Sequence, residues 1–353
     1  FRGLERVPVE EAEAGDIIAI AGLAEGTVPD TIASPEQALP LPAIPVDPPT
    51  LSMTFRINDG PLGGREGKKV TSRQIRDRLY REAEGNVAIK VKDSEEAEAF
   101  EVAGRGELQL GVLIETMRRE GFELTIGRPR VILRRDEVTG ERLEPFEEVL
   151  IDVDEQYAGV VVEKMSLRKG ELRDMRPSGA GKTRLTFLIP SRGLIGYHGE
   201  FLTDTRGTGI MNRLFAGYMP WKGTIEGRRN GALISNADGE AVHYALFYLQ
   251  ERGVLFVNPG DKVYVGMMIG ENSRAEDLEV NPIKEKKLTN IRAAGKDDAM
   301  LLTPPRRMSL EQAIAYVDDD ELVEVTPSAI RLRKRFLDPH ERKRAERRAE
   351  EAA

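Results

Sequence analysis

The run from Arg176 to Thr183 (RPSGAGKT) holds residue types that could bind nucleotide phosphates, because a glycine-rich loop followed by lysine and threonine forms the core of a P-loop. The full pattern requires glycine at the first position, where this chain has Arg176. It also requires a helix after the loop, whereas residues 183–189 (TRLTFLI) alternate like a strand. We therefore expect a glycine-rich β-hairpin. A nucleotide-binding enzyme that uses Gly179–Thr183 is the alternative.

Three cations of this predicted hairpin, Arg173, Lys182 and Arg184, are candidates for contacts with RNA phosphates. Other chemistry is limited. The chain has no cysteine, which excludes disulfides, thiolate zinc sites and a cysteine nucleophile, and its three histidines form no HExxH motif. The acidic run Asp318–Glu321 is more typical of a solvated turn than of a metal site. We predict no catalytic residue, no metal and no cofactor in this chain.

A second cationic segment lies between residues 281 and 296, where lysine and arginine alternate with amide and hydroxyl side chains and few bulky residues could anchor a core. Such a loop suits phosphates and 2′-hydroxyls and can become ordered on binding; a solvated surface loop without a partner is the alternative. The segment contains no aromatic residue, which favours recognition of backbone or shape over base stacking. The candidate RNA-binding residues here are Asn281, Lys284, Lys286, Lys287, Asn290 and Arg292, with Arg307 downstream.

The whole-chain composition bounds these interpretations. The chain has 353 residues, which predicts two to four domains, and a net charge of −8, so any contact with nucleic acid depends on local patches. It contains no apolar run of about 18 residues, which excludes a membrane-spanning helix. The first residues do not form a signal peptide and do not begin with methionine, so we expect that the sequence starts within a longer protein.

Hydrophobic periodicity predicts the elements that position these residues. A short β-type run at Gly15–Ile20 resembles the end of a small barrel, and six prolines between residues 35 and 49 indicate an extended linker. Two βαββαβ units, the ferredoxin-like layout, follow. The first is expected at 51–57, 71–84, 87–91, 100–102, 107–120 and 122–126, and the second at 146–153, 159–167, 171–176, 183–189, 194–203 and 209–218.

The region after residue 220 differs. We expect a strand at 231–234, a helix at 240–251, and a hairpin of 254–257 with 263–269 around the turn Asn258–Asp261. A helix capped by Ser309 and strands at 322–325 and 329–332 follow. Arg331, Arg333 and Arg335 would share one face of the last strand, and residues 341–353 would form a solvated helix or frayed terminus.

Several runs together resemble the BipA/TypA family of ribosome-associated translational GTPases. GRGELQL at residues 104–110 and SRGLIG at 191–196 are similar to the wider elongation-factor-G class. KKLTNIR at 286–292 and DDDELVEV at 318–325 resemble BipA in particular. The resemblance covers nearly the whole chain.

The resemblance implies an α+β multidomain protein. Residues 1–45 would be the end of β-barrel domain II plus a linker, 46–135 ferredoxin-like domain III, 144–224 ferredoxin-like domain V, and 225–353 the mixed α/β domain specific to this family. The family's N-terminal G domain, which would bind GTP and magnesium, has no counterpart in this sequence. The resemblance therefore does not imply that this chain hydrolyses GTP.

By the same resemblance, this chain would be a cytoplasmic monomer that binds the 70S ribosome, contacts ribosomal RNA and A-site tRNA through the loop at 281–296, and acts in stress response and ribosome assembly. A general RNA-binding protein unconnected with ribosomes is a further alternative.

Overall fold

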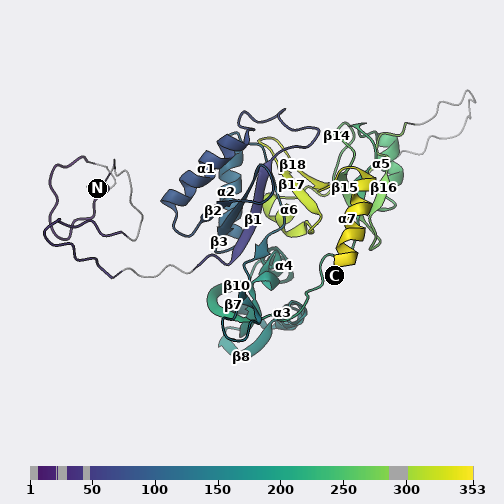
Figure 1. Cartoon of the computed structure of the whole chain (residues 1–353). Coiled ribbons are helices and arrows are strands. Elements are labelled where there is room, and N and C mark those ends of the chain that lie inside the picture. Colours follow the sequence, from purple (N-terminus) through teal and green to yellow (C-terminus); the bar gives the residue numbers. More distant parts are fainter. Residues whose placement is uncertain (1–6, 21, 23–29, 43–47, 286–300, 353) are drawn as a thin grey trace, which may run out of the picture.

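The computed structural model of the chain describes residues 7–20, 22, 30–42, 48–285 and 301–352 (Figure 1). The described residues before Pro48 form neither helix nor strand. The strand expected at Gly15–Ile20, and with it the partial barrel, is therefore wrong for the described residues. The reason is that an isolated β-type run has no neighbouring strand to pair with; the Ile17 side chain, 88% exposed, packs against no core.

The first ferredoxin-like unit is confirmed, with its four strands in the order β4-β1-β3-β2. Leu51, Met53 and Phe55 alternate into the core from β1, whose predicted bounds are those observed. Thr71 begins the first helix with a capping box in which Gln74 is the reciprocal partner. The elements are β1 (Leu51–Ile57), α1 (Ser72–Gly85), β2 (Lys90–Asp93), β3 (Ala99–Gly104), α2 (Glu107–Arg119) and β4 (Leu124–Ile126). Short β5 (Arg130–Val131) also pairs with β1.

The second ferredoxin-like unit is also confirmed, in the order β10-β7-β9-β8, with α3 and α4 packed on one face of its sheet. Phe187 and Ile189 of β9 and Val161 and Met165 of α3 are fully buried in the core between them. The elements are β6 (Arg134–Arg135), β7 (Arg142–Asp154), α3 (Glu155–Leu167), β8 (Glu171–Gly179), β9 (Lys182–Pro190), the 3-10 turn η1 (Ser191–Leu194), α4 (Tyr197–Asp204) and β10 (Ile210–Pro220).

The remaining region combines short strands with three helices within the described residues. Ser309 caps α6 with a capping box, as its sequence predicts. The elements are β11 (Ala232–Ser235), β12 (Gly239–Glu240), α5 (His243–Leu249), β13 (Gly253–Leu255), β14 (Lys262–Val263), β15 (Met267–Asn272), β16 (Leu278–Val280), α6 (Leu310–Tyr316), β17 (Glu321–Val325), β18 (Ile330–Lys334) and α7 (Pro339–Ala352).

The predicted pairing of 254–257 with 263–269 around Asn258–Asp261 is confirmed only in part. Val254 of β13 pairs with Glu271 of β15, while Val263 of β14 pairs with Gly239 of β12. The tight turn is real, because the Asp261 side chain accepts a hydrogen bond from the Asn258 N–H at 2.8 Å, but it leads into a different strand. The predicted helix at 240–251 is correspondingly shorter, since β12 takes its first residue.

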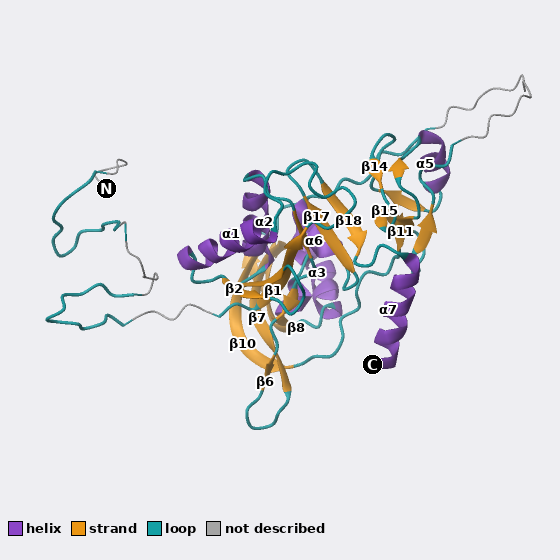
Figure 2. Ribbon diagram, turned by 45° about the horizontal axis from the view of Figure 1, so that its top comes forward, coloured by secondary structure: helices purple, strands orange, loops and turns teal. Residues whose placement is uncertain are grey.

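One continuous sheet joins the first unit to the C-terminal region (Figure 2). Strand β17 pairs antiparallel with β4, with Val323 opposite Ile126, and the strand order runs β16-β11-β15-β18-β17-β4-β1-β3-β2. Both regions share one apolar core, which contains Phe55 and Ile314. Boundaries at 46–135, 144–224 and 225–353 stay predictions, because a shared sheet does not mark where one folding unit ends.

Candidate nucleic-acid interface

The glycine-rich run is a hairpin. Strands β8 and β9 pair with Gly179 opposite Lys182, and the two residues between them, Ala180 and Gly181, have positive φ angles of 49° and 72°. Positive φ at both central residues is the requirement of a two-residue type I′ turn, which matches the twist of paired strands. The strand after the loop leaves no helix N-terminus to face a phosphate, so the P-loop alternative is excluded for Gly179–Thr183.

Each candidate cation of this hairpin has a carboxylate partner. Both Arg184 nitrogens Nε and Nη2 donate to the Asp152 carboxylate, each at 2.9 Å. This guanidinium holds the pKa of Asp152 below its usual value. Lys182 Nζ lies 3.5 Å from Asp154 Oδ1, and Arg173 Nη2 lies 2.9 Å from Glu171 Oε2. An RNA phosphate at this hairpin would therefore compete with internal carboxylates.

The second cationic segment begins and ends beside α5. Lys284 is exposed, and the Asn281 side chain accepts a hydrogen bond from the Ile283 N–H at 3.0 Å. The Pro282 carbonyl accepts from Val242 N at 2.9 Å, just before the helix. On the far side of the segment, Gln250 donates to the Leu301 carbonyl at 3.0 Å. The candidates Lys286, Lys287, Asn290 and Arg292 lie outside the described residues.

The downstream candidate Arg307 is 60% exposed, and its Nη2 lies 2.9 Å from Asp261 Oδ2, in the turn between β13 and β14. The contact of Pro282 with Val242 and the pair of Arg307 with Asp261 thus bring Asn281, Lys284 and Arg307 to the part of the C-terminal region that carries α5 and β14, the two elements labelled in Figure 1. Arg173, Lys182 and Arg184 lie in a different unit. The predicted candidates form two separate groups.

The alternating arginines of β18 do not form an exposed basic face. Arg333 is 2% exposed and donates to Asp59, and Arg331 donates to Glu66. Glu324 of β17, fully buried, lies 3.6 Å from Arg333 Nε. Arg331 and Arg333 therefore bind the C-terminal region to the loop after β1 instead of a polyanion.

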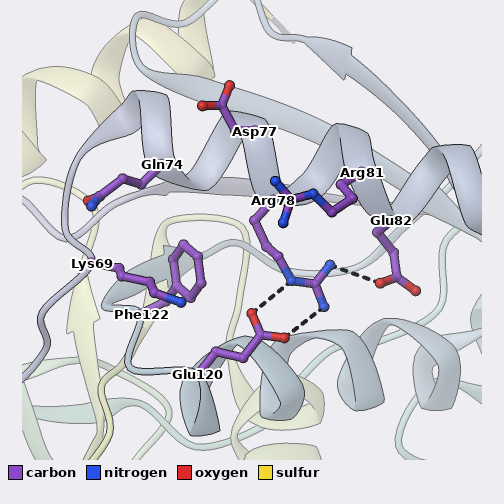
Figure 3. A pocket seen from close by; sticks show the side chains of 8 residues that line it. All are labelled: Lys69, Gln74, Asp77, Arg78, Arg81, Glu82, Glu120 and Phe122. Atoms are coloured by element: carbon purple, nitrogen blue, oxygen red, sulfur yellow. Dashed lines mark hydrogen bonds and ion pairs between the residues drawn. The ribbon is translucent and has the colours of Figure 1, made fainter. Parts of the chain in front are cut away.

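Two surface hollows were candidates for a small-molecule site. A groove of about 670 Å³ between α1 and α2 is lined by Lys69, Arg78 and Arg81, which are balanced by Asp77, Glu82 and Glu120. Figure 3 shows the Arg78 guanidinium bound by Glu120, at 2.8 and 3.0 Å, and by Glu82. The balance of charge selects neither an anion nor a cation.

The larger hollow, of about 900 Å³, lies where α2, α4, β10 and α6 meet. On its wall, the Glu107 carboxylate accepts a hydrogen bond from Gly196 N at 2.8 Å and so joins α2 to the start of α4. Burial raises the pKa of Glu107, and the Gly196 N–H opposes that rise. Because elements of the first unit, the second unit and the C-terminal region line this hollow, we interpret it as a junction between units.

Within the described ranges, no group of three or more histidine, aspartate or glutamate side chains is placed to hold a metal ion. Nor does any described helix have the length and apolar character that a membrane span requires.

Comparison with known proteins gives these surfaces a context. The family model for the TypA/BipA C-terminal domain matches residues 230–339, and that for the elongation factor G C-terminus matches residues 141–229. The large ribosomal subunit assembly factor BipA of Salmonella typhimurium is 54% identical over 346 residues, which are 98% of this chain and 57% of that protein. The protein of that name from Synechocystis is 51% identical, over 95% of this chain and 56% of its own length. The chain belongs to the BipA/TypA family.

The two groups of candidates fall in different matched regions of this BipA/TypA chain. Arg173, Lys182 and Arg184 lie in the elongation factor G match, and Asn281, Lys284 and Arg307 lie in the TypA/BipA C-terminal match, as do Lys286, Lys287, Asn290 and Arg292 in sequence. The chain spans a little over half the length of its curated BipA relatives.

Proposed function

We propose that this chain docks a translational GTPase of the BipA/TypA family onto the ribosome, contacting ribosomal RNA and the A-site tRNA. The observation that carries the proposal is the identity of 54% over 98% of the chain with a protein named as an assembly factor of the large ribosomal subunit. On this proposal the chain works in the cytoplasm as a monomer, supports ribosome assembly and stress response, and contributes binding without a catalytic residue, metal or cofactor of its own.

The residues proposed to contact RNA near the tRNA are Lys284, Lys286, Lys287, Asn290 and Arg292. Two features of the described chain support this choice. Lys284 is exposed and pairs with no carboxylate in the described part of the chain. Hydrogen bonds at Pro282 and Leu301 hold both flanks of the segment beside α5, which fixes the place from which it reaches a partner. Asn281 takes a lesser part, since its side chain caps the local turn.

Arg307 and the hairpin cations Arg173, Lys182 and Arg184 are proposed as secondary RNA contacts. Each already pairs with a carboxylate, so an RNA phosphate must displace that partner. We expect each of them to contribute less to affinity than an unpaired lysine, because the gain on binding is reduced by the pair that is lost.

Co-sedimentation with 70S ribosomes across a salt series tests the proposal. The parent chain is compared with the triple variant Lys286→Ala, Lys287→Ala, Arg292→Ala and with a charge-matched control, Arg73→Ala, Lys90→Ala, Arg119→Ala, whose residues are exposed on the first unit. Each lost phosphate contact reduces the slope of log affinity against log salt by about one unit, so the triple variant should lose about three. No saturable binding of the parent at low salt, or equal losses in both variants, would refute the proposal.

A further inference from the structure

Helix α7 at the C-terminus carries a second, independent cationic surface. Lys343, Arg344, Arg347 and Arg348 follow an i, i+1, i+4, i+5 spacing, which places all four on one side of a helix. All four are exposed. We call this set the α7 basic face.

The first turn of α7 fixes the direction of this face. Arg342 is 10% exposed; its Nη2 donates to Glu279 Oε1 of β16 at 2.7 Å, and its Nη1 donates to the Leu337 carbonyl at 2.6 Å. Asp338 caps the helix by accepting from the N–H groups of His340 and Glu341. Because Arg342 points into the body, helical geometry turns the α7 basic face outward.

The cations of this face lack the ion pairs that the other candidates make, although the same helix also carries Glu341, Glu346, Glu350 and Glu351 in its sequence. Within the described residues, none of the four makes an ion pair, whereas Arg173, Lys182, Arg184 and Arg307 each have a carboxylate within 4.0 Å. A chain of net charge −8 that keeps four unpaired cations on one anchored surface can attract a polyanion there without breaking internal pairs.

The composition of α7 selects among polyanions. Apart from alanine and Pro339, its 14 residues include no apolar side chain, so the helix has no face to insert into a lipid surface or to pack against a protein groove. Arginine and lysine without aromatic neighbours match the phosphate backbone of a nucleic acid. A helix of this length extends about 21 Å, enough to follow several phosphates.

We propose that the α7 basic face binds the phosphate backbone of structured RNA, as a contact separate from the segment beside α5. This inference rests on the proposed ribosome docking and extends it. Glu279, to which the helix is anchored, lies in β16, two positions before Asn281. Figures 1 and 2 show α7 running from the strands β15 and β16 away from α5. Strand β16 therefore anchors α7 and leads into the segment beside α5, and the two cationic elements would contact RNA at different points.

The test measures binding of the full chain to large ribosomal subunits and to protein-free ribosomal RNA across a salt series. The variant Lys343→Gln, Arg344→Gln, Arg347→Gln, Arg348→Gln keeps helix propensity while removing the charges. The charge-matched control is Arg73→Gln, Arg81→Gln, Lys90→Gln, Arg119→Gln. The charge-preserving variant is Arg344→Lys, Arg347→Lys, Arg348→Lys.

We expect the first variant to lower the salt slope by about three to four units on both RNA targets, because each phosphate contact contributes about 0.7 to 0.9. The lysine variant and the matched control should each stay within about one unit of the parent. If the parent binds and the four-glutamine variant has the same salt slope as the parent, the inference about α7 is overturned while the docking proposal stands. An effect seen with subunits but not with protein-free RNA assigns the face to an acidic protein and also overturns it. Absence of parental binding refutes the docking proposal as well.

Discussion

Glu321 is the residue whose removal should most clearly weaken the C-terminal region. Its carboxylate is fully buried and accepts from Arg228 Nη1 and Nη2 at 2.9 and 2.8 Å, and from Lys334 Nζ at 2.9 Å. The N–H of Asp318 donates to it at 2.9 Å. Burial opposes the charge of Lys334, but Glu321 and Asp320 outweigh it and raise the lysine pKa. One carboxylate therefore compensates two largely buried cations.

The change Glu321→Ala affects the two cations, Arg228 and Lys334, unequally. Lys334 keeps Asp277 and Asp320 at 2.6 and 2.8 Å, whereas Arg228 keeps the carbonyl oxygens of Asn230 and Tyr316 and the Tyr316 ring, but no carboxylate bonded to it. Breaking a buried pair by removing one partner costs about 3–5 kcal/mol. We expect a loss near the lower end, about 3 kcal/mol, because only Arg228 is left without a carboxylate.

Urea unfolding at neutral pH measures this loss. The control is Glu101→Ala, which removes the partner of Lys92 in an exposed pair, where a loss below about 1 kcal/mol is expected. A double-mutant cycle with Arg228→Ala should show a coupling energy of about 1–3 kcal/mol. If Glu321→Ala destabilises the chain no more than Glu101→Ala, the buried network does not stabilise the fold.

Three further changes probe local structure. Thr71→Ala removes the capping box of α1 and should cost about 1 kcal/mol in thermal unfolding, while Thr71→Ser should be nearly neutral; equal losses would contradict the cap. Gly196 and Gly207 both have positive φ, 72° and 76°, but a Cβ at Gly196 would come within 2.6 Å of Ala315 Cβ whereas one at Gly207 meets nothing within 4 Å. Gly196→Ala should therefore cost about 1–3 kcal/mol more than Gly207→Ala, and equal urea midpoints would oppose this. Burial raises the folded-state pKa of Glu107 above 4.5, so the folded state binds more protons and stability falls as pH rises from about 4.5 through that pKa. Glu107→Gln should flatten this dependence above pH 4.5; an unchanged slope would exclude Glu107 as its source.

Local patterns predicted both ferredoxin-like units because each signal is short in range. Alternation of Leu51, Met53 and Phe55 gives β1, and the Thr71–Gln74 spacing gives the start of α1. The same reasoning failed at Gly15–Ile20, since a strand is defined by a partner that the run itself cannot reveal. The pairing of Val263 with Gly239, outside the predicted hairpin, is a choice between competing partners, which periodicity does not rank.

The candidate site shows the same limit. Sequence spacing placed Arg331 and Arg333 correctly on one strand, but Asp59 and Glu66, more than 200 positions away, determine that they are buried. Residues 341–352 form the solvated helix that was one of the two expectations, but the anchor from Arg342 to Glu279 was not predicted, because it spans 63 positions. Whether a cation is free or paired depends on such distant carboxylates.

The seam between β4 and β17 also has a consequence for synthesis of the protein. Its two sides are far apart in the chain: Arg118, just before β4, donates to the Thr326 carbonyl across 208 positions. At about 5–20 residues per second, a ribosome needs about 10–40 s to make β17 after β4. Throughout that interval the nascent first unit presents β4 as an unpaired strand edge, a site of incorrect pairing. Successful folding in the cell then depends on protection of the β4 edge, or on a delay in the folding of the first unit, until the C-terminal strands emerge.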